Sequence, residues 1–182
     1  MPKTTAESVL LEILRQSDGE WTGKTRLFKA FYFAHLYYGS QRPGLLTDWP
    51  FARMPQGPGI DKSDELFARL TEGGLLTSEM VHGEGPYPEY RYRLTENGFK
   101  SPPVPEDAAR AIEKSVLFCK DKSAGQLSQL THDHSRSWIE GKDGDILNID
   151  IDLIPEEEYV KRQAELRRLE TSLADIFQGA PV

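Results

Sequence analysis

The chain has 182 residues, of which 38% are hydrophobic and 10% aromatic, so it can bury the core of one ordinary domain. It has 22 Lys and Arg against 29 Asp and Glu, which gives a formal net charge of −7. This acidity excludes a protein whose whole surface binds nucleic acid, because phosphate binding requires clustered Lys and Arg. The charge is uneven: residues 1–60 carry +2, residues 61–140 carry −4 and residues 141–182 carry −5.

The single cysteine, Cys119, cannot form a disulfide within the chain, and a lone thiol is typical of cytosolic proteins. Residues 1–7 lack the apolar stretch of a signal peptide. No run approaches the roughly 18 apolar residues that a membrane-spanning helix needs. We therefore expect a soluble cytoplasmic protein with no membrane partner.

Two helices are predicted near the N-terminus. Apolar residues recur at helical spacing over 6–14, and Thr4 with Glu7 matches a capping box at the start of this helix. A second helix is predicted over 24–38, and beyond Lys29 it is apolar on nearly every side. Such a helix is either central and covered all round, or it presents a spare face to a partner.

Residues 40–59 are predicted to form neither helix nor strand. Pro43, Pro50, Pro55 and Pro58 fix φ and remove backbone donors, and glycines stand among them. The segment also contains large apolar side chains, so we expect it to pack against the body of the protein.

A short third helix is predicted at 61–71, followed by a β-hairpin at about 75–95. Three helices and then a hairpin is the order of a winged-helix domain. We therefore expect a mainly α (α+β) fold with a winged-helix-like part at residues 1–101. Prolines at 102–105 mark the start of a helical part, residues 102–182, packed on the first part in a single compact unit.

The second half is predicted to be mostly helical. The expected elements are a helix with a buried stripe from Ala109 to Cys119, a helix capped by Ser123 and Gln126, a short strand within 145–153, and a long helix from Pro155 to about Phe177, closed by Gly179 and Pro181. The leucine stripe of the long helix packs on the rest of the chain, forms a homodimer seam, or binds another protein.

A winged helix that binds DNA places its third helix in the major groove and its wing on the backbone. Here the third helix has a net charge of −2, and the expected wing tip adds Glu84 and Glu89. Arg91 and Arg93 are the only basic pair nearby. We therefore expect no nucleic-acid partner, although a winged-helix DNA-binding transcriptional regulator remains the alternative function.

No catalytic constellation follows from residue spacing. His132 and His134 could hold a metal if they lay on a strand, but they follow a helical pattern, which points them apart. Cys119 lies on an apolar helix face, as structural thiols do. The acidic residues of 143–152 lack the spacing of a calcium loop, and Gly57-Pro58-Gly59 lacks the donors of a phosphate loop. We expect no enzyme activity, no metal and no cofactor.

Three segments in order resemble the SocA-like antitoxin family, also called the Panacea domain. Residues 27–35, LFKAFYFAH, resemble its "LxKLLYFAH" helix, and residues 49–60 resemble its "F-x-A-W-x-x-GP-V" loop. Residues 123–132, followed by Trp138, resemble its "S-x-x-x-L-S-x-x-T-H…W" helix. Arg53 departs from the family by replacing an aromatic residue. The resemblance spans about Lys24 to Gly141.

The resemblance implies an antitoxin of a toxin–antitoxin system that neutralises a cognate toxin by direct binding. Some members act as adaptors that deliver the toxin to a protease, so a protease or chaperone is a second implied partner, and phage-associated members occur. It implies neither catalysis nor a cofactor. The positions of the family motifs that it implies for partner binding are Trp49, Phe51, Arg53, Gln56, Gly57, Pro58, His132 and Trp138.

Overall fold

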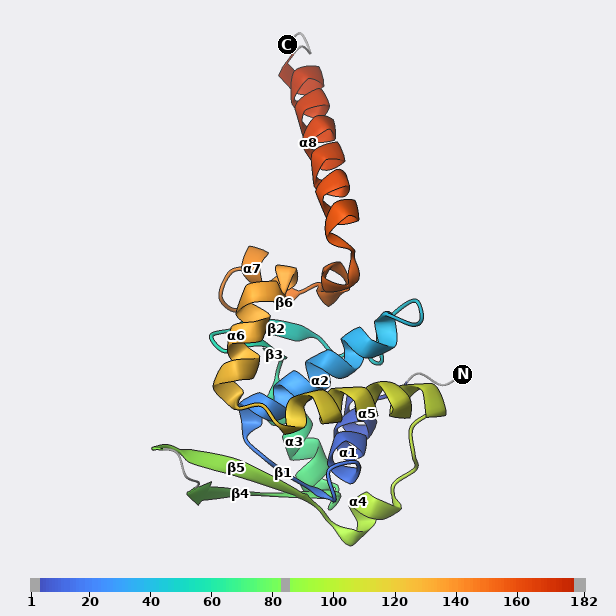
Figure 1. Ribbon diagram of the computed structural model, residues 1–182, viewed down its shortest axis with the longest axis vertical. Helices are drawn as coiled ribbons and strands as arrows, with labels where there is room; N and C mark the ends of the chain where they lie inside the picture. The colour runs from blue at the N-terminus through green and yellow to red at the C-terminus, as the bar shows by residue number, and fades with distance from the viewer. Residues whose placement is uncertain (1–3, 83–85, 179–182) are drawn as a thin grey trace. The chain divides into compact units, whose positions relative to one another are not determined.

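The computed structural model describes residues 4–82 and 86–178, and it shows an α+β fold with two small antiparallel sheets (Figure 1). The helices are α1 (Ala6–Arg15), α2 (Lys24–Gly39), α3 (Ser63–Glu72), α4 (Glu96–Lys100), α5 (Glu106–Lys120), α6 (Ala124–His134), α7 (Arg136–Glu140) and α8 (Glu156–Gln178), with a 3₁₀ helix, η1, at Ile149–Leu153. The strands are β1 (Glu20–Thr22), β2 (Phe51–Met54), β3 (Gly57–Ile60), β4 (Leu76–His82), β5 (Pro88–Leu94) and β6 (Ile146–Leu147). Among the described residues, no helix combines the length and the apolar character that crossing a bilayer requires.

The chain forms two compact units, Met1–Asp152 and Leu153–Val182. Helices α5 and α6 belong to the first unit, so the division follows Asp152 and not the prolines at 102–105. The reason is that Ile112 of α5 and Leu127 of α6 are fully buried in the same core as α1 and α2.

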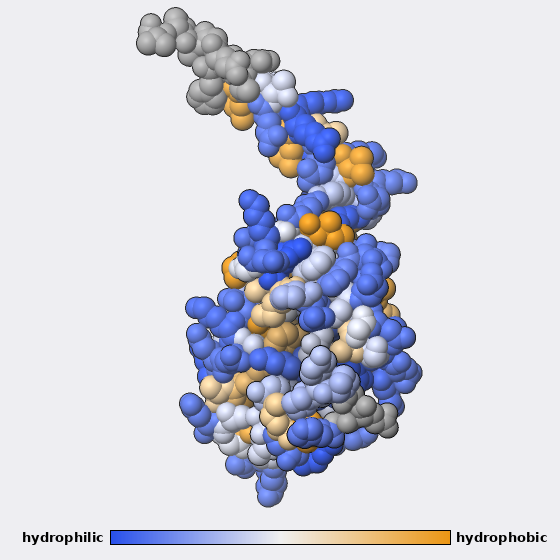
Figure 2. Space-filling view, turned by 90° about the vertical axis from the view of Figure 1, so that its left-hand side faces the viewer, coloured by the Kyte–Doolittle hydropathy of each residue, from blue (hydrophilic) through white to orange (hydrophobic). Residues whose placement is uncertain are grey.

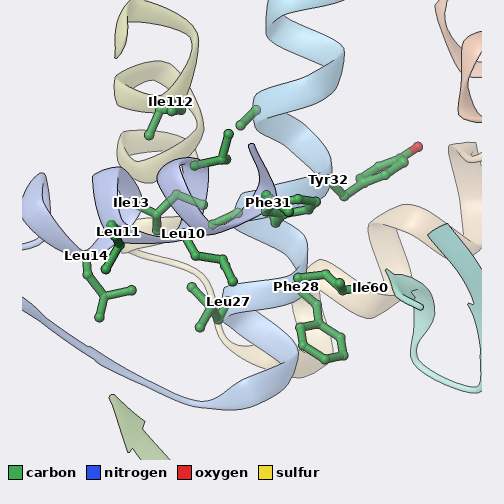
Figure 3. Close-up of a cluster of buried hydrophobic side chains, with 14 of the residues drawn as sticks. Leu10, Leu11, Ile13, Leu14, Leu27, Phe28, Phe31, Tyr32, Ile60 and Ile112 are labelled. Carbon is green, nitrogen blue, oxygen red and sulfur yellow. The ribbon is translucent and has the colours of Figure 1, made fainter. Parts of the chain in front are cut away.

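Helix α2 is the centre of the first unit, as its nearly uniform apolar sequence indicates. It packs against α1, α5, α6 and β3, and the β4–β5 hairpin and the β2–β3 hairpin lie on opposite sides of the central helices (Figure 1). Figure 3 shows Leu27 and Phe31 of α2 among Leu10 and Ile13 of α1 and Ile112 of α5. The sequence allowed two interpretations of this helix, and the structure supports the one in which α2 is central and covered by other elements.

The N-terminal cap of α1 differs by one residue from the prediction. Thr5, not Thr4, is the N-cap, and its partner in the capping box is Ser8, not Glu7. The hydroxyl of Thr5 accepts from the Ser8 N–H at 3.1 Å, and the Ser8 hydroxyl accepts from the Thr5 N–H at 3.1 Å. Thr4 instead donates to the carbonyl of Leu46, which ties the helix start to a distant loop.

The prediction that residues 40–59 contain no strand is wrong. Phe51–Met54 pairs antiparallel with Gly57–Ile60, and β2 also pairs with β6, so β2 is the middle strand of the order β3-β2-β6. Proline is tolerated at position 58 because β3 is an edge strand, and the missing backbone N–H of Pro58 therefore removes no hydrogen bond between strands. The prediction that the segment packs against the body is confirmed, since Leu46 and Phe51 are buried.

The predicted hairpin is confirmed, with β4 and β5 shifted by about one residue. Gly83, Glu84 and Gly85 of its expected tip lie outside the described residues. A third strand, β1, was not predicted because it is only three residues long, and it completes the order β1-β5-β4. Its central residue, Trp21, is opposite Tyr92, and both side chains are buried.

The strand predicted within 145–153 is only partly present. Ile146–Leu147 pairs with β2, but Ile149–Leu153 forms a 3₁₀ helix. The alternating pattern of this segment does not continue as a strand because the carboxylate of Asp152 is hydrogen-bonded to residues at the start of α7. The expected end of the long helix at Gly179 and Pro181 lies outside the described residues.

The second unit contains α8, and four large apolar side chains of this helix are exposed. Val160, Leu166, Leu169 and Leu173 each have about half or more of their surface accessible, and Figure 2 shows apolar residues along this helix among hydrophilic ones. Intramolecular packing, homodimerisation and binding of another protein through this helix therefore stay predictions.

His35 lies fully buried in α2, and this burial has a consequence at acidic pH. Its Nδ1 lies 2.8 Å from the Phe31 carbonyl oxygen and its Nε2 lies 3.1 Å from the Thr47 hydroxyl. Burial lowers the pKa of His35 to about 4. As the pH falls, His35 therefore binds a proton near pH 6.5 in the unfolded chain, whereas in the folded chain it does so only near pH 4. We expect stability to fall between about pH 6.5 and about pH 4, by about 3 kcal/mol from this group.

The measurement is the free energy of urea unfolding of the wild type and of His35→Gln across this pH interval. The variant should lose less stability on acidification than the wild type. The matched control is His82→Gln, because His82 is exposed on β4, and this control should keep the full loss. Equal acid profiles of the wild type and His35→Gln would contradict the prediction.

Candidate functional site

The three segments that carry the family resemblance meet in space. Lys29 of α2 donates from Nζ to the carbonyl oxygen of Pro58 in β3 at 3.1 Å. The indole Nε1 of Trp138 in α7 donates to the carbonyl oxygen of Met54 in β2 at 2.8 Å. Arg53 Nε donates to the carbonyl oxygen of Trp138 at 2.8 Å. Segments separated by more than 80 residues therefore form one cluster around the β2–β3 hairpin.

Lys29 is the most unusual residue of this cluster because it is a buried cation. Its side chain is 1% exposed, and the Pro58 carbonyl is its one hydrogen-bond acceptor among the described residues. No carboxylate of the described part of the chain forms an ion pair with it. Burial lowers the pKa of Lys29 to about 7, and the nearby Cys119 opposes this shift slightly. At neutral pH the amine is thus divided between its charged and neutral forms.

Gly57 allows Lys29 and α6 to approach the hairpin. A Cβ at this position would stand 2.3 Å from Thr131 Oγ1 and 2.4 Å from Lys29 Nζ. The Thr131 hydroxyl is already bonded to the Ser128 carbonyl at 2.9 Å. The φ of Gly57 is +100°, which L side chains rarely adopt. Glycine is therefore required both by backbone conformation and by the contact between β3, α2 and α6.

Substitution of Gly57 with alanine should destabilise the protein strongly. Backbone strain costs about 1–2 kcal/mol, and displacing Lys29 and Thr131 adds about 1–3 kcal/mol. Gly44 is the matched control, because its φ is +92° and nothing lies within 4 Å of an added Cβ. Urea unfolding should show a loss for Gly57→Ala about twice that for Gly44→Ala, and equal losses would contradict the predicted steric contribution.

Arg53, Trp138 and His132 form a second contact group beside the hairpin. The guanidinium carbon of Arg53 lies 4.1 Å from the Trp138 ring centroid, and the His132 ring stacks on Trp138 at 4.0 Å with an angle of 12°. Arg53 also forms an ion pair with Asp143. The flat guanidinium of Arg53 provides a stacking surface for the Trp138 ring.

The predicted partner-binding residues differ widely in accessibility. Phe51 is 2% exposed and packs against Phe31 and His35, so it belongs to the core. Gly57 and Pro58 are buried, whereas Gln56 at the hairpin turn is exposed. The remaining members are half-buried: Trp49, Arg53, His132 and Trp138. Trp49 lies apart from the Trp138 group, with its indole N–H bonded to the Asp61 carbonyl at 2.7 Å.

Two further polar residues were missed by the sequence analysis. Asp152 accepts hydrogen bonds from the Tyr32 hydroxyl at 2.6 Å, from Ser135 Oγ at 3.0 Å and from the backbone N–H of Ser137 at 2.8 Å. This carboxylate and burial raise the pKa of Tyr32, which stays protonated. Lys29 was the other missed residue, and its signal was a single charged residue within the apolar stretch Leu27–Phe33 of α2.

A groove of about 380 Å³ adjoins Lys29. Its walls are the first two turns of α2, the β2–β3 hairpin and the start of α3. The lining residues are Lys24, Thr25, Phe28, Lys29, Met54, Pro55, Gln56, Gly57, Pro58, Gly59 and Ser63. They combine apolar side chains with two lysines, and none of these residues is acidic.

The residues that were candidates for metal or thiol chemistry are His132 and His134 on α6 and Cys119 on α5. No three His, Cys, Asp or Glu side chains of residues 4–82 and 86–178 gather as metal ligands would. His132 and His134 lie on α6, as predicted, and His132 stacks on Trp138 while His134 is exposed. Cys119 is buried, and burial raises its pKa to about 11, which disfavours the reactive thiolate.

Comparisons of the chain with protein-family models, with curated proteins and with solved structures found no match. A functional hypothesis therefore depends on the residues and their geometry.

Proposed function

We propose that this chain is an antitoxin-type protein-binding module of the SocA-like kind, which neutralises a cognate toxin by binding it directly. The observation that carries the proposal is the convergence of the three motif segments. Hydrogen bonds join Lys29 to Pro58 and Trp138 to Met54, and these partners are 29 and 84 residues apart in the sequence. Residues of a shared family motif are expected to converge in this way when the motif describes one structural centre.

Exposed apolar residues next to this cluster support a protein partner. Ile139 on α7 is 51% exposed, and Ile146 on β6 is 60% exposed. Ile146 is opposite Ala52 in the β2–β6 pair, one residue from Arg53. Exposed large apolar side chains are typical of the centres of protein interfaces. We therefore place the proposed partner surface on β6, α7 and the exposed edge of Arg53.

The test is co-expression with the product of the adjacent gene. The two proteins should co-purify through size-exclusion chromatography, and growth inhibition by the neighbour should be relieved by this chain. Absence of both a complex and growth rescue would reject the proposal. Co-purification of a protease or a chaperone in the same experiment would support the adaptor variant of the function.

A surface variant makes the test specific. Ile146→Glu should weaken the complex by about tenfold or more, because it places a charge in an apolar contact. Leu117→Glu is the matched control, since Leu117 is 61% exposed but lies on α5, outside the motif segments. If the two variants bind the partner with equal affinity, the partner surface does not include Ile146.

A winged-helix arrangement is part of the proposal. Apart from the β2–β3 hairpin, which lies between α2 and α3, the element order α1, β1, α2, α3, β4, β5 supports it, as does the sheet order β1-β5-β4. This makes a DNA-binding regulator the second candidate function.

The charges of the wing weigh against DNA binding. Arg93 forms ion pairs with Glu20 at 2.6 Å and with Glu79 at 2.8 Å, and Arg91 lies 3.4 Å from Glu20. These arginines are already neutralised, so they offer little to a phosphate. A gel shift with the upstream DNA at physiological salt should show no binding, and salt-sensitive nanomolar binding would favour the regulator.

A further inference from the structure

Helix α8 presents an exposed apolar seam, which is formed by Leu166, Leu169 and Leu173. These leucines are spaced i, i+3 and i+7, so their side chains lie on one face of the helix. They are 50%, 60% and 52% exposed. Single exposed leucines are common on protein surfaces, but three on one face at this spacing form the stripe through which paired helices pack.

Both edges of this seam are acidic. In a heptad in which Leu166 and Leu173 are a positions and Leu169 is a d position, Glu165 is at g and Glu170 is at e. The two glutamates therefore border the leucines on opposite sides. Both are exposed, and neither forms an ion pair within the part of the chain that the structure describes. Their charges are thus available to a partner.

The basic residues of α8 do not neutralise these edges. Lys161, Arg167 and Arg168 lie, by helical spacing, outside the seam and its two edges. Arg162 is on the seam side, one turn before the first leucine, but it forms an ion pair with Glu158 of the same helix. The surroundings of the three leucines therefore carry negative charge.

A second copy of this chain does not complement the charges of the seam. In a parallel pair of α8 helices, a g position faces the following e position of the other helix, so Glu165 would meet Glu170. In an antiparallel pair, g positions face g positions and e positions face e positions, and between residues 158 and 172 these positions hold no Lys or Arg. Because opposite charges at e and g set the choice of partner in paired helices, the seam favours a partner with basic edges.

We propose that the α8 seam docks on an amphipathic helix of another protein, one whose apolar stripe is bordered by Lys and Arg. The three leucines pack against that stripe, and Glu165 and Glu170 form ion pairs with the basic edges. Docking also stabilises α8, since most helical stability in proteins comes from burial of an apolar face. The contact uses residues outside the β6–α7 surface and does not depend on the antitoxin function.

The experiment titrates the full chain with two labelled peptides and follows fluorescence anisotropy. One peptide has four repeats of Lys-Ile-Ala-Ala-Leu-Lys-Glu, and the other has four repeats of Glu-Ile-Ala-Ala-Leu-Glu-Lys, so the two share their apolar stripe and differ in edge charge. The basic-edged peptide should bind with a Kd below about 100 μM and at least about tenfold more tightly than the acidic-edged peptide. This difference should shrink at high salt. Equal binding of the two peptides, or no binding of the basic-edged peptide, would overturn the proposal.

Variants of α8 assign the binding to the seam and to its edges. Leu169→Glu should abolish binding of the basic-edged peptide. Thr171→Glu is the matched control, because it introduces the same residue at an exposed position on the opposite side of α8, and it should change the Kd less than about threefold. The double variant Glu165→Lys, Glu170→Lys should bind the acidic-edged peptide more tightly than the basic-edged one. If the double variant keeps the wild-type preference, the glutamates do not select the partner.

Sedimentation of the chain alone tests the competing occupant. The wild type should be a monomer at the concentrations of the titration. A dimer that dissociates in Leu169→Glu would overturn the proposal in favour of a second copy. These outcomes are separate from toxin neutralisation, because failure of peptide binding leaves complex formation with the adjacent gene product and growth rescue unaffected.

Discussion

Replacing Lys29 with methionine is expected to remove a rise in stability that the wild type shows between about pH 7 and about pH 10. Burial lowers the pKa of Lys29 from 10.5 to about 7. Below about pH 7 both the folded and the unfolded chain carry the proton, so the folded state has the full cost of a buried charge. Above this pH the folded state releases the proton while the unfolded state keeps it, and stability increases with pH. The whole change amounts to about 5 kcal/mol.

The measurement is the free energy of urea unfolding of both proteins at several pH values between about 6 and about 9. Lys29→Met should be the more stable protein at the acidic end, because an apolar side chain of similar length replaces an unpaired buried cation. The difference should shrink as the pH rises. Cys119 and Tyr32 also titrate at high pH, but they are present in both proteins and cancel in the difference. Parallel pH profiles would contradict the burial of a charged Lys29.

Replacing Asp152 with alanine is expected to destabilise the first unit by about 3–5 kcal/mol. The carboxylate of Asp152 accepts from Tyr32 OH, Ser135 Oγ, Ser137 N and Ser137 Oγ. The three donor residues are each no more than 4% exposed, so their donors would lose their acceptor without gaining water. An unsatisfied buried donor costs about 1–3 kcal/mol.

Asp150→Ala is the matched control, because Asp150 lies in the same 3₁₀ helix and is exposed. Its substitution should change the free energy of unfolding by less than about 0.5 kcal/mol. Hydrogen exchange gives a second readout: the amide of Ser137 should lose protection in Asp152→Ala and keep it in Asp150→Ala. A small stability change with unchanged protection would show that the contacts of Asp152 are not needed to hold α7.

These two predictions concern both ends of the candidate site. Lys29 connects α2 to the β2–β3 hairpin, and Asp152 connects α2 to α7 through Tyr32. The proposed partner surface on β6 and α7 therefore depends on Asp152, whereas Lys29 holds the β2–β3 hairpin against α2. Asp152→Ala should therefore impair the complex with the partner through loss of structure.

Local sequence patterns predicted most of the helices. The apolar spacing of 6–14 and the nearly uniform apolar character of 24–38 correspond to α1 and α2, because burial of these faces agrees with helical periodicity. The capping box of Ser123 and Gln126 is also confirmed. Such signals are local, and three or four neighbouring residues are enough to produce them.

The sequence-based predictions are wrong where contacts between segments far apart in the sequence decide the local structure. β2 and β3 form among prolines because β3 is an edge strand and β6, more than 90 residues away, pairs with the other side of β2. Residues Ile149–Leu153 form η1 and not the expected strand, because the Asp152 carboxylate accepts hydrogen bonds from Tyr32 of α2 and Ser137 of α7. Neither partner can be recognised from the segment itself.

The sequence by itself determined the α+β class, the presence of helix α2, the hairpin at β4–β5 and the candidate motif residues. The tertiary structure alone decided which of these residues form a site. It buried Phe51 in the core, left Gln56 exposed, and placed the ammonium of Lys29 beside Gly57 with no carboxylate of the described residues to neutralise it. The physical reason is that the cost of burying a charge depends on its surroundings in space, and those surroundings come from segments more than 25 residues away in the chain.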